Sequence, residues 1–451
     1  MTTLLQPWAN LAAPALLKRR RVRKPLARLG AWLAFLVLGT MAATGGPSQP
    51  NFIFILIDDM GYGDLSCYGG EGVQTTHIDR LAHEGIRFTQ FYVASPICSP
   101  SRTAFTTGQY PARWRITSYL AARRENERRG MAQWLDPKAP TLARMLREAG
   151  YTTGHFGKWH MGGQRDVGEA PLITEYGFDE SLTQFEGLGD RILPLCDAFD
   201  GSPPTRHALG SDNLGRGNIT WMDRSKITGA FVERALKFIQ RAEQTGRPFY
   251  VNLWPDDVHS PFFPPKDLRG DGSKRQLYLG VVKAMDEQFA PLFDYVRASP
   301  TLRSNTLIIV SSDNGPEPGA GVAGPFRGHK GTLYEGGIRE PLIVWGPGLV
   351  DAAAAGSTKY PLAASRRWAS RISSSVASSA SHPNCRALRT ISSPPGGSPE
   401  VMASATVSFP VTGTTRSRPS RTAATMGLTF AAWTTIIRGS LAISPAARSS
   451  R

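Results

Sequence analysis

The stretch NFIFILI, residues Asn51–Ile57, is an unbroken apolar run that ends on two acids, Asp58 and Asp59. A run of this kind is typical of a strand that is buried on both faces in a parallel sheet. Three later stretches follow the same pattern, namely Pro248–Leu253, Thr306–Val310 and Pro341–Trp345. The sequence therefore predicts four central strands between residues 51 and 348.

Helical patterns lie between these predicted strands. Pro140–Ala149 begins with a proline, repeats apolar residues at helical spacing and is followed by a glycine, which is a typical helix start and stop. Longer helices are expected at Lys226–Glu243 and Gln276–Arg297, the second interrupted or bent at Pro291. Strands that alternate with helices favour an α/β fold with a mostly parallel central sheet and helices on both faces.

Polar side chains follow the ends of the predicted strands. Asp58 and Asp59 follow the first, His259 lies shortly after the second, and Asp313 and Asn314 follow the third. In open α/β sheets, ligands bind outside the carboxyl ends of the strands. We therefore expect these residues to meet in one crevice.

A second chemical feature is the motif Cys98–Arg102, with the sequence CSPSR. Ser99 and Pro100 fit a helix N-cap followed by the first helical position. Arg102 follows Cys98 by four residues, so both side chains can face the same side of the opening turn. A helix N-terminus with a nearby cation suits an anion, whereas a cysteine without that context would be a small buried residue. The motif predicts a site for an oxyanion ester.

These motifs resemble, in their order and spacing, those of the sulfatase family, in which the motif cysteine is oxidised to formylglycine. The resemblance runs from residue 51 to residue 348, and within the family it is to the arylsulfatase group that includes the N-acetylgalactosamine-6-sulfatase type. It implies an alkaline-phosphatase-like fold and a sulfuric-ester hydrolase for a sulfated carbohydrate or an aryl sulfate. The matching segments are Asp58-Asp59, Cys98–Arg102 with Thr107-Gly108, Gly157–His160, His259–Pro261, Ser312–Gly315, Gly328–Gly331 and Tyr334–Pro341.

The resemblance also implies a metal site. Asp58, Asp59, Asp313 and Asn314, together with residue 98, would hold a divalent cation. Oxygen donors of this kind suit Ca²⁺, with Mg²⁺ as the alternative, and they disfavour zinc.

The catalytic roles implied by the resemblance start from formylglycine at position 98, made by a formylglycine-generating enzyme and hydrated to a gem-diol. One hydroxyl, polarised by the metal and Arg102, would attack sulfur. His259 would protonate the leaving alcohol or phenol, and His160 would assist the release of sulfate. Lys158 and Lys330 would neutralise the sulfate oxygens.

Two other functions remain open. A phosphatase or phosphodiesterase of the same superfamily would use Ser or Thr as nucleophile and often a second metal, which CSPSR and a single oxygen-rich metal set disfavour. The second alternative is a non-catalytic relic of the family, which binds glycans without cleaving them. Arg123, Arg124, Arg128 and Arg129 form a basic cluster that is either a solvated loop or a contact for a polyanionic substrate, and Asp286 is expected to be structural.

The two ends of the chain differ from its middle. A basic run, Lys18–Lys24, precedes an apolar stretch over residues 29–41 and then small residues, which predicts a signal peptide over residues 1–47. We expect export to the periplasm or beyond and no stable membrane span after cleavage, with an uncleaved anchor as the alternative. The net charge of +16 is concentrated in these ends, so no nucleic-acid partner is predicted.

The catalytic domain is assigned to residues 48–350 and an aberrant or disordered region to residues 351–451. This region is rich in Ser, Ala, Arg, Thr and Pro, with Asp351 and Glu400 as its only acids. The small C-terminal α+β subdomain that the resemblance implies is not recognisable in it. We therefore expect a frameshift, in the gene or its sequencing, between Gly348 and Arg366, and resequencing tests it. A disordered extension is the alternative.

Overall fold

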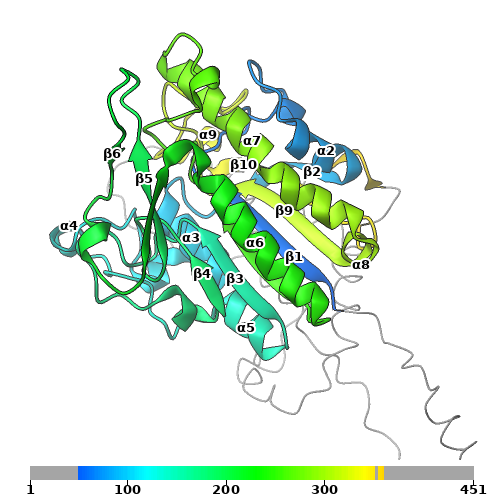
Figure 1. Ribbon diagram of the computed structural model, residues 1–451, viewed down its shortest axis with the longest axis horizontal. Coiled ribbons are helices and arrows are strands. Elements are labelled where there is room, and N and C mark those ends of the chain that lie inside the picture. The colour runs from blue at the N-terminus through cyan, green and yellow to red at the C-terminus, as the bar shows by residue number, and fades with distance from the viewer. Residues whose placement is uncertain (1–48, 351–353, 360–451) are drawn as a thin grey trace, which may run out of the picture. The chain divides into compact units, whose positions relative to one another are not determined.

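A computed structural model describes residues 49–350 and 354–359 (Figure 1). The predicted signal peptide lies outside the described residues, as does all but a short part of the predicted aberrant C-terminal region. None of the helices in the described ranges is both long and apolar enough to cross a membrane.

The domain is built on an eight-stranded sheet with the strand order β11-β2-β10-β9-β1-β8-β3-β4. Strand β10 runs antiparallel to its neighbours β9 and β2, and the other neighbouring strands are parallel. The predicted mostly parallel sheet is therefore confirmed. Its strands are β1 (Asn51–Ile57), β2 (Ile86–Tyr92), β3 (Thr152–Gly157), β4 (Glu180–Leu182), β8 (Phe249–Trp254), β9 (Thr306–Ser312), β10 (Arg339–Trp345) and β11 (Ser357–Lys359).

Helices cover both faces of the sheet, because successive side chains of a buried strand point to opposite faces. In β1, Ile53, Ile55 and Ile57 face one core, whereas Phe54 and Leu56 face the other. Helices α2, α6 and α7 pack on the first core, and Figure 1 shows α6 and α7 on the near face of the sheet, running along the direction of β1 and β9. Helices α3 and α5 pack on the second. Helix bounds are α2 (Thr76–Glu84), α3 (Cys98–Thr107), α4 (Arg123–Arg128), α5 (Leu142–Glu148), α6 (Ile227–Gln244), α7 (Lys274–Ala298), α8 (Pro300–Asn305) and α9 (Glu335–Ile338).

The predicted elements occur close to their expected positions. The four apolar runs form β1, β8, β9 and β10, and the three helical patterns form α5, α6 and α7. Of the interruption or bend expected at Pro291, the interruption is wrong, because α7 continues through that residue. Pro291 and Glu287 are both exposed, so water can bind the Glu287 carbonyl that the proline leaves without a donor.

A second, smaller sheet with the order β6-β5-β7 was not predicted. It consists of β5 (Arg191–Cys196), β6 (Thr205–Arg206) and β7 (Ile219–Asp223), and it lies beside the main sheet (Figure 1). Strands this short and polar carry a weak sequence signal. This sheet matters for function because it supplies part of the wall of the cavity described below.

Candidate active site

The carboxyl ends of four adjacent strands meet at one edge of the sheet. Strands β9, β1, β8 and β3 are consecutive in the sheet and parallel. Their exits carry, in that order, Asp313-Asn314, Asp58-Asp59, the loop with His259, and Lys158 with His160. The expected convergence of residues from distant parts of the chain is therefore present.

The exit of β3 depends on a glycine. Gly157 has a φ of +120°, and a Cβ atom at this position would lie 2.1 Å from the carbonyl oxygen of Trp254. Only glycine tolerates both the conformation and the approach. The backbone N–H of Lys158 then donates to that same carbonyl oxygen at 2.8 Å, which fixes the direction in which the Lys158 side chain leaves the sheet.

The acidic residues form a compact cluster of oxygen atoms. Carboxylate oxygens of Asp58, Asp59 and Asp313 lie within 4.8 Å of one another, and all three residues are fully buried. The Asn314 side chain donates from Nδ2 to Asp59 Oδ1 at 2.7 Å. Its Oδ1 atom is buried and has no hydrogen-bond partner among the described residues.

This cluster fits a hard divalent cation. Burial, together with the Asp58 and Asp59 carboxylates, raises the pKa of Asp313 well above its ordinary value despite Arg102. A bound cation would relieve this repulsion, and it would satisfy the unpartnered oxygen of Asn314. An oxygen-only donor set of this kind suits Ca²⁺ or Mg²⁺.

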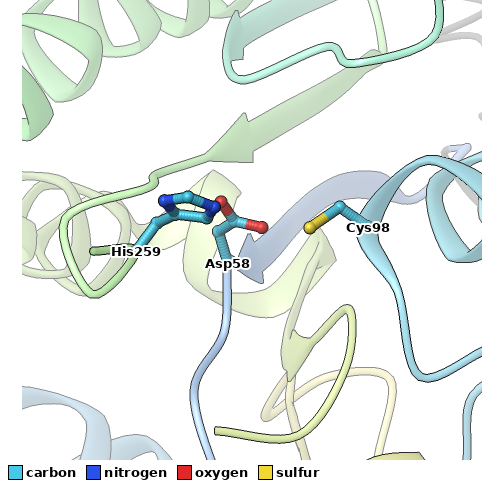
Figure 2. Close-up of side chains that lie close together, drawn as sticks. All are labelled: Asp58, Cys98 and His259. Atoms are coloured by element: carbon cyan, nitrogen blue, oxygen red, sulfur yellow. The ribbon is translucent and has the colours of Figure 1, made fainter. Parts of the chain in front are cut away.

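The predicted nucleophile position lies at the start of α3. Cys98 is buried, and its Sγ atom lies 3.9 Å from Asp59 Oδ1. It forms a second close group with Asp58 and His259, and Figure 2 shows the Cys98 sulfur pointing toward the Asp58 carboxyl group. Burial and the Asp58 carboxylate raise the pKa of the Cys98 thiol well above its ordinary value.

The expected N-cap at Ser99 is wrong. Helix α3 begins at Cys98, so Ile97 occupies the N-cap position and Ser99 lies inside the first turn. The Ser99 hydroxyl instead accepts a hydrogen bond from the backbone N–H of Leu120 at 2.9 Å. Ser99 thus ties the nucleophile helix to the next segment of the site, where the Leu120 carbonyl contacts His160.

Arg102 is fully buried and holds the cluster together. Its guanidinium donates to Asp313 Oδ2 at 2.8 Å, to Asp58 Oδ1 at 3.0 Å and to the Lys158 carbonyl oxygen at 3.0 Å. Its charge also lies 5.3 Å from the ring centroid of Trp254. Because the planar fork fits two carboxylates at once, a lysine could not replace these contacts.

Lys158 and His160 both contact the carboxylate of Glu186, a residue that the sequence analysis did not predict as part of the site. Glu186 Oε2 lies 3.1 Å from Lys158 Nζ and 3.1 Å from His160 Nδ1. Lys158 Nζ also donates to Asp58 Oδ2 at 2.7 Å. Burial opposes the charge on Asp58, but Lys158 and Arg102 outweigh it and hold the pKa of Asp58 well below its ordinary value.

The contacts of the His160 ring place a proton. Its Nε2 atom lies 3.0 Å from the Leu120 carbonyl oxygen, so Nε2 donates there. Nδ1 faces Glu186 Oε2, but neither atom makes a hydrogen bond in the described structure. Burial lowers the pKa of His160 to about 3, although Glu186 opposes that effect. His160 is therefore the neutral tautomer that carries its proton on Nε2, with the unprotonated Nδ1 beside the Glu186 carboxylate.

Lys330 and His259 complete the opposite side of the site. Lys330 Nζ donates to Asp59 Oδ2 at 2.5 Å and lies 3.2 Å from His259 Nε2. The Nδ1 atom of His259 donates to the Ser260 carbonyl oxygen at 2.8 Å. The His259 side chain is 32% exposed, whereas that of Asp59 is fully buried, so His259 is the group that faces arriving molecules.

These residues open into a cavity of about 300 Å³. Its lining includes Cys98, His160, Glu186, His259 and Lys330. The rest of the lining, which we call the outer wall, comes from the small sheet and from loops, with Tyr119, Arg165, Phe185, Pro194, Cys196, His207, Leu209, Arg224 and Phe263. A cavity of this size accepts a small organic group in contact with the reactive residues.

The basic cluster of α4 is not part of this cavity. Arg123 pairs with Glu169, and Arg128 and Arg129 pair with Glu125. Arg124 is exposed, and none of the four arginines lines the cavity. Asp286 also lies away from it and accepts hydrogen bonds from the backbone N–H groups of His77 and Ile78 at the start of α2, which is a structural role.

The fold and the position of the site at the strand ends define an α/β protein of the alkaline-phosphatase-like class. The sequence matches the sulfatase family over residues 50–371, and the chain belongs to this family.

Named relatives agree with this assignment. N-acetylgalactosamine-6-sulfatase of Canis lupus familiaris is 33% identical over 343 residues, which is 73% of this chain and 63% of the relative. Arylsulfatase G of Homo sapiens is 32% identical over 334 residues, covering 67% of this chain and 61% of the relative. The chain thus spans somewhat less than two thirds of these relatives. The crystal structure of PsFucS1 sulfatase from Pseudoalteromonas sp. superimposes with a TM-score of 0.54 at 26% identity, covering 75% of this chain and 69% of that one.

Proposed function

We propose that this chain hydrolyses sulfate esters of carbohydrates or phenols, with residue 98 as formylglycine and a divalent cation in the acidic cluster. One observation carries the proposal. The motif cysteine lies at the N-terminus of α3, beside four oxygen-donor residues and within one network with Arg102, Lys158 and Lys330. This combination suits an ester that is anionic before and after its cleavage.

Asp58, Asp59, Asp313 and Asn314 would hold the cation, with residue 98 close enough to join them. We propose Ca²⁺, with Mg²⁺ as the alternative, because every donor in the cluster apart from residue 98 is an oxygen atom. When bound, the cation would supply Lewis-acid stabilisation of negative charge. Arg102 would keep Asp58 and Asp313 oriented for it, since it donates to both.

Position 98 would supply the nucleophile. Formylglycine, made from Cys98 by a formylglycine-generating enzyme, would offer an aldehyde whose hydrate carries a reactive hydroxyl. The chain's own contribution is to hold this residue at a helix N-terminus, where free backbone N–H groups favour an anion. The fully buried Arg102 adds a fixed positive charge one turn further along α3.

The remaining residues would bind sulfate and manage protons. Lys158 and Lys330 lie on either side of the acidic pair, in contact with Asp58 and Asp59 respectively, and would turn their remaining N–H donors to the sulfate oxygens. His259 would protonate the leaving oxygen from Nε2, because its Nδ1 is committed to Ser260. His160 would assist the release of sulfate, with the Glu186 carboxylate 3.1 Å from its Nδ1 atom.

The relatives and the cavity support the proposed substrate class. The names N-acetylgalactosamine-6-sulfatase and arylsulfatase G refer to a sulfated sugar and an aryl sulfate as the substrates of those relatives. Aromatic side chains in the cavity wall, among them Tyr119, Phe185 and Phe263, suit the face of either kind of ring.

The test is hydrolysis of a chromogenic aryl sulfate, compared with the matching aryl phosphate. Protein made together with a formylglycine-generating enzyme should release the phenol from the sulfate, and Cys98→Ala should abolish this activity. Cys67→Ala is the matched control, because Cys67 is another free cysteine that does not line the cavity. Faster cleavage of the phosphate would favour the phosphatase, and binding without cleavage would favour the glycan-binding relic.

A further inference from the structure

The outer wall of the cavity carries charge that the reaction itself does not use. Two arginines and one histidine line it, namely Arg165, Arg224 and His207. All three line the same cavity as Lys330 and His259, the residues proposed to contact the scissile sulfate and its leaving group. Their individual partners decide whether this wall can hold a ligand.

Arg224 is already neutralised. Its Nη1 atom lies 3.1 Å from Asp256 Oδ1, and its Nη2 atom donates to the Asp256 carbonyl oxygen at 2.6 Å. Asp256 itself lines the cavity. This buried pair contributes shape and polarity to the wall but little net charge.

Arg165 differs from Arg224. Across the described residues, its guanidinium makes no hydrogen bond or ion pair, although the residue is half-buried in the cavity wall. Five N–H donors are therefore available at this point of the wall. A half-buried guanidinium without a protein acceptor is a suitable partner for a carboxylate or sulfate.

The backbone around Arg165 is held in an uncommon conformation. Arg165 and Leu209 both have positive φ angles, 54° and 50°, and both line the cavity. The two loops approach closely, because a Cβ atom on Gly210 would lie 2.6 Å from the Arg165 carbonyl oxygen. Non-glycine residues in this region of φ are uncommon and concentrate at ligand sites. The packing thus places Arg165 and His207 in neighbouring loops.

His207 is the second component. Its backbone N–H donates to the Pro194 carbonyl oxygen at 3.0 Å, which anchors it to β5. Its ring packs edge-on against Phe185 with the centroids 5.9 Å apart. Burial, Arg224 and Arg165 lower the pKa of His207, so the positive charge of Arg165 reaches this ring. The neutral imidazole can still donate one hydrogen bond.

We propose that Arg165 and His207 form a second anion-binding subsite, which holds a carboxylate or a second sulfate group of the substrate while its scissile sulfate ester lies beside residue 98. The proposal rests on the proposed function for the identity of the scissile ester. It makes a polyanionic glycan fragment the preferred substrate over a simple aryl sulfate. The charge pattern supports this choice, because an uncharged leaving group would leave Arg165 without a counter-ion on binding.

The test uses three probes: a hexosamine with one sulfate, a hexosamine with two sulfates, and a uronate-containing disaccharide with one sulfate. Dissociation constants are measured by calorimetry in a Cys98→Ala background, which prevents turnover, and kcat/KM is measured on the active protein. Arg165→Gln should weaken binding of the probes with two anionic groups by about tenfold or more, and that of the monosulfated hexosamine by less than about twofold. Comparison of the two dianionic probes shows whether the subsite prefers carboxylate or sulfate.

Two control variants separate this subsite from other effects. Arg124→Gln removes an exposed arginine of α4 that does not line the cavity, and it should leave all three dissociation constants unchanged. Arg165→Lys keeps the charge and should retain part of the preference for dianionic probes, which a purely structural role would not explain.

The outcomes are distinguishable from those for the proposed function. Three results would contradict the subsite. Arg124→Gln could weaken binding as much as Arg165→Gln does, Arg165→Gln could weaken binding of all three probes equally, or the parent protein could show no preference for the dianionic probes. Arg165-dependent binding in a protein that cleaves no sulfate ester would leave the subsite standing and refute the proposed function. Normal cleavage of sulfate esters without any effect of Arg165 substitutions on binding would support the proposed function and refute the subsite.

Discussion

Replacement of Glu186 by glutamine tests whether this unpredicted carboxylate holds the site together. Glu186 is buried and contacts both Lys158 and His160. Burial raises its pKa, but His160 and Lys158 overcome that effect and lower the pKa of Glu186 to about 2, from an ordinary value of 4.5. Glutamine keeps the shape of the side chain and removes its charge.

The magnitude follows from this pKa change. Each pKa unit corresponds to about 1.4 kcal/mol, so the change from 4.5 to about 2 sets an upper bound on the order of 3 kcal/mol for the contribution of the carboxylate to the free energy of unfolding. It is an upper bound because part of the change comes from a charged His160, whose own pKa is lowered by burial to about 3. Because the pKa is lower in the folded state, this contribution is fully present above pH 4.5 and is lost as the pH falls toward about 2. The other charged groups that act on Glu186 are His259 and Asp58, at longer range. Glu186→Gln should therefore destabilise the protein by up to about 3 kcal/mol at pH 7 and by roughly half as much or less at pH 3.

The assay is urea denaturation at several pH values, with kcat/KM for an aryl sulfate measured at pH 7. Activity should fall on the order of ten- to hundredfold, because Lys158 and His160 lose the group that orients them. Glu148→Gln is the matched control, since Glu148 is exposed. A stability loss that is absent, or that is the same at pH 7 and pH 3, would show that the Glu186 charge does not stabilise the site.

Three further predictions concern the metal, the core and the N-terminus. Chelation should inactivate the protein, and added Ca²⁺ or Mg²⁺ should restore its activity. Asp313→Ala should lower activity on the order of a hundredfold or more, with loss of bound metal. Unchanged metal content and an unchanged rate in this variant would contradict the assignment of the acidic cluster as the metal site. Asp286→Ala should cost about 2–5 kcal/mol in the free energy of unfolding, because two N–H groups of α2 lose their acceptor, and should leave kcat/KM unchanged. We propose that the exported protein begins between residues 43 and 48, which N-terminal sequencing tests; an intact Met1 on soluble cytoplasmic material would contradict it.

The strand ends could be predicted because strong patterns mark them. β1, β8, β9 and β10 are continuous apolar runs, and a parallel sheet brings their carboxyl ends together wherever they lie in the chain. Strand β3 was not predicted, because its sequence, TTGHFG, is poor in apolar residues. Tertiary packing compensates, since His155 lies between the rings of Trp159 and Trp254.

Glu186 and Arg165 could not be predicted, for a different reason. Glu186 is one of 36 acidic residues and stands in no recognisable motif. Its role depends on a loop after β4 that returns to the exit of β3, where the His160 N–H donates to the Glu186 carbonyl oxygen at 2.7 Å. Arg165 becomes a candidate ligand-binding residue only through its position near the small sheet, whose short strands carry little sequence signal. Partners that are set by tertiary packing leave no local pattern.

Mass spectrometry of the tryptic peptide that spans residues 88–102 shows whether Cys98 is converted to formylglycine. In a preparation that releases sulfate, the account predicts a form of this peptide in which one oxygen replaces the sulfur and two hydrogens of Cys98, and which reacts with hydrazide or aminooxy probes. The fraction of this form should rise in proportion to the specific activity across preparations. Full activity in protein from which only unmodified, alkylatable Cys98 is recovered would contradict the account.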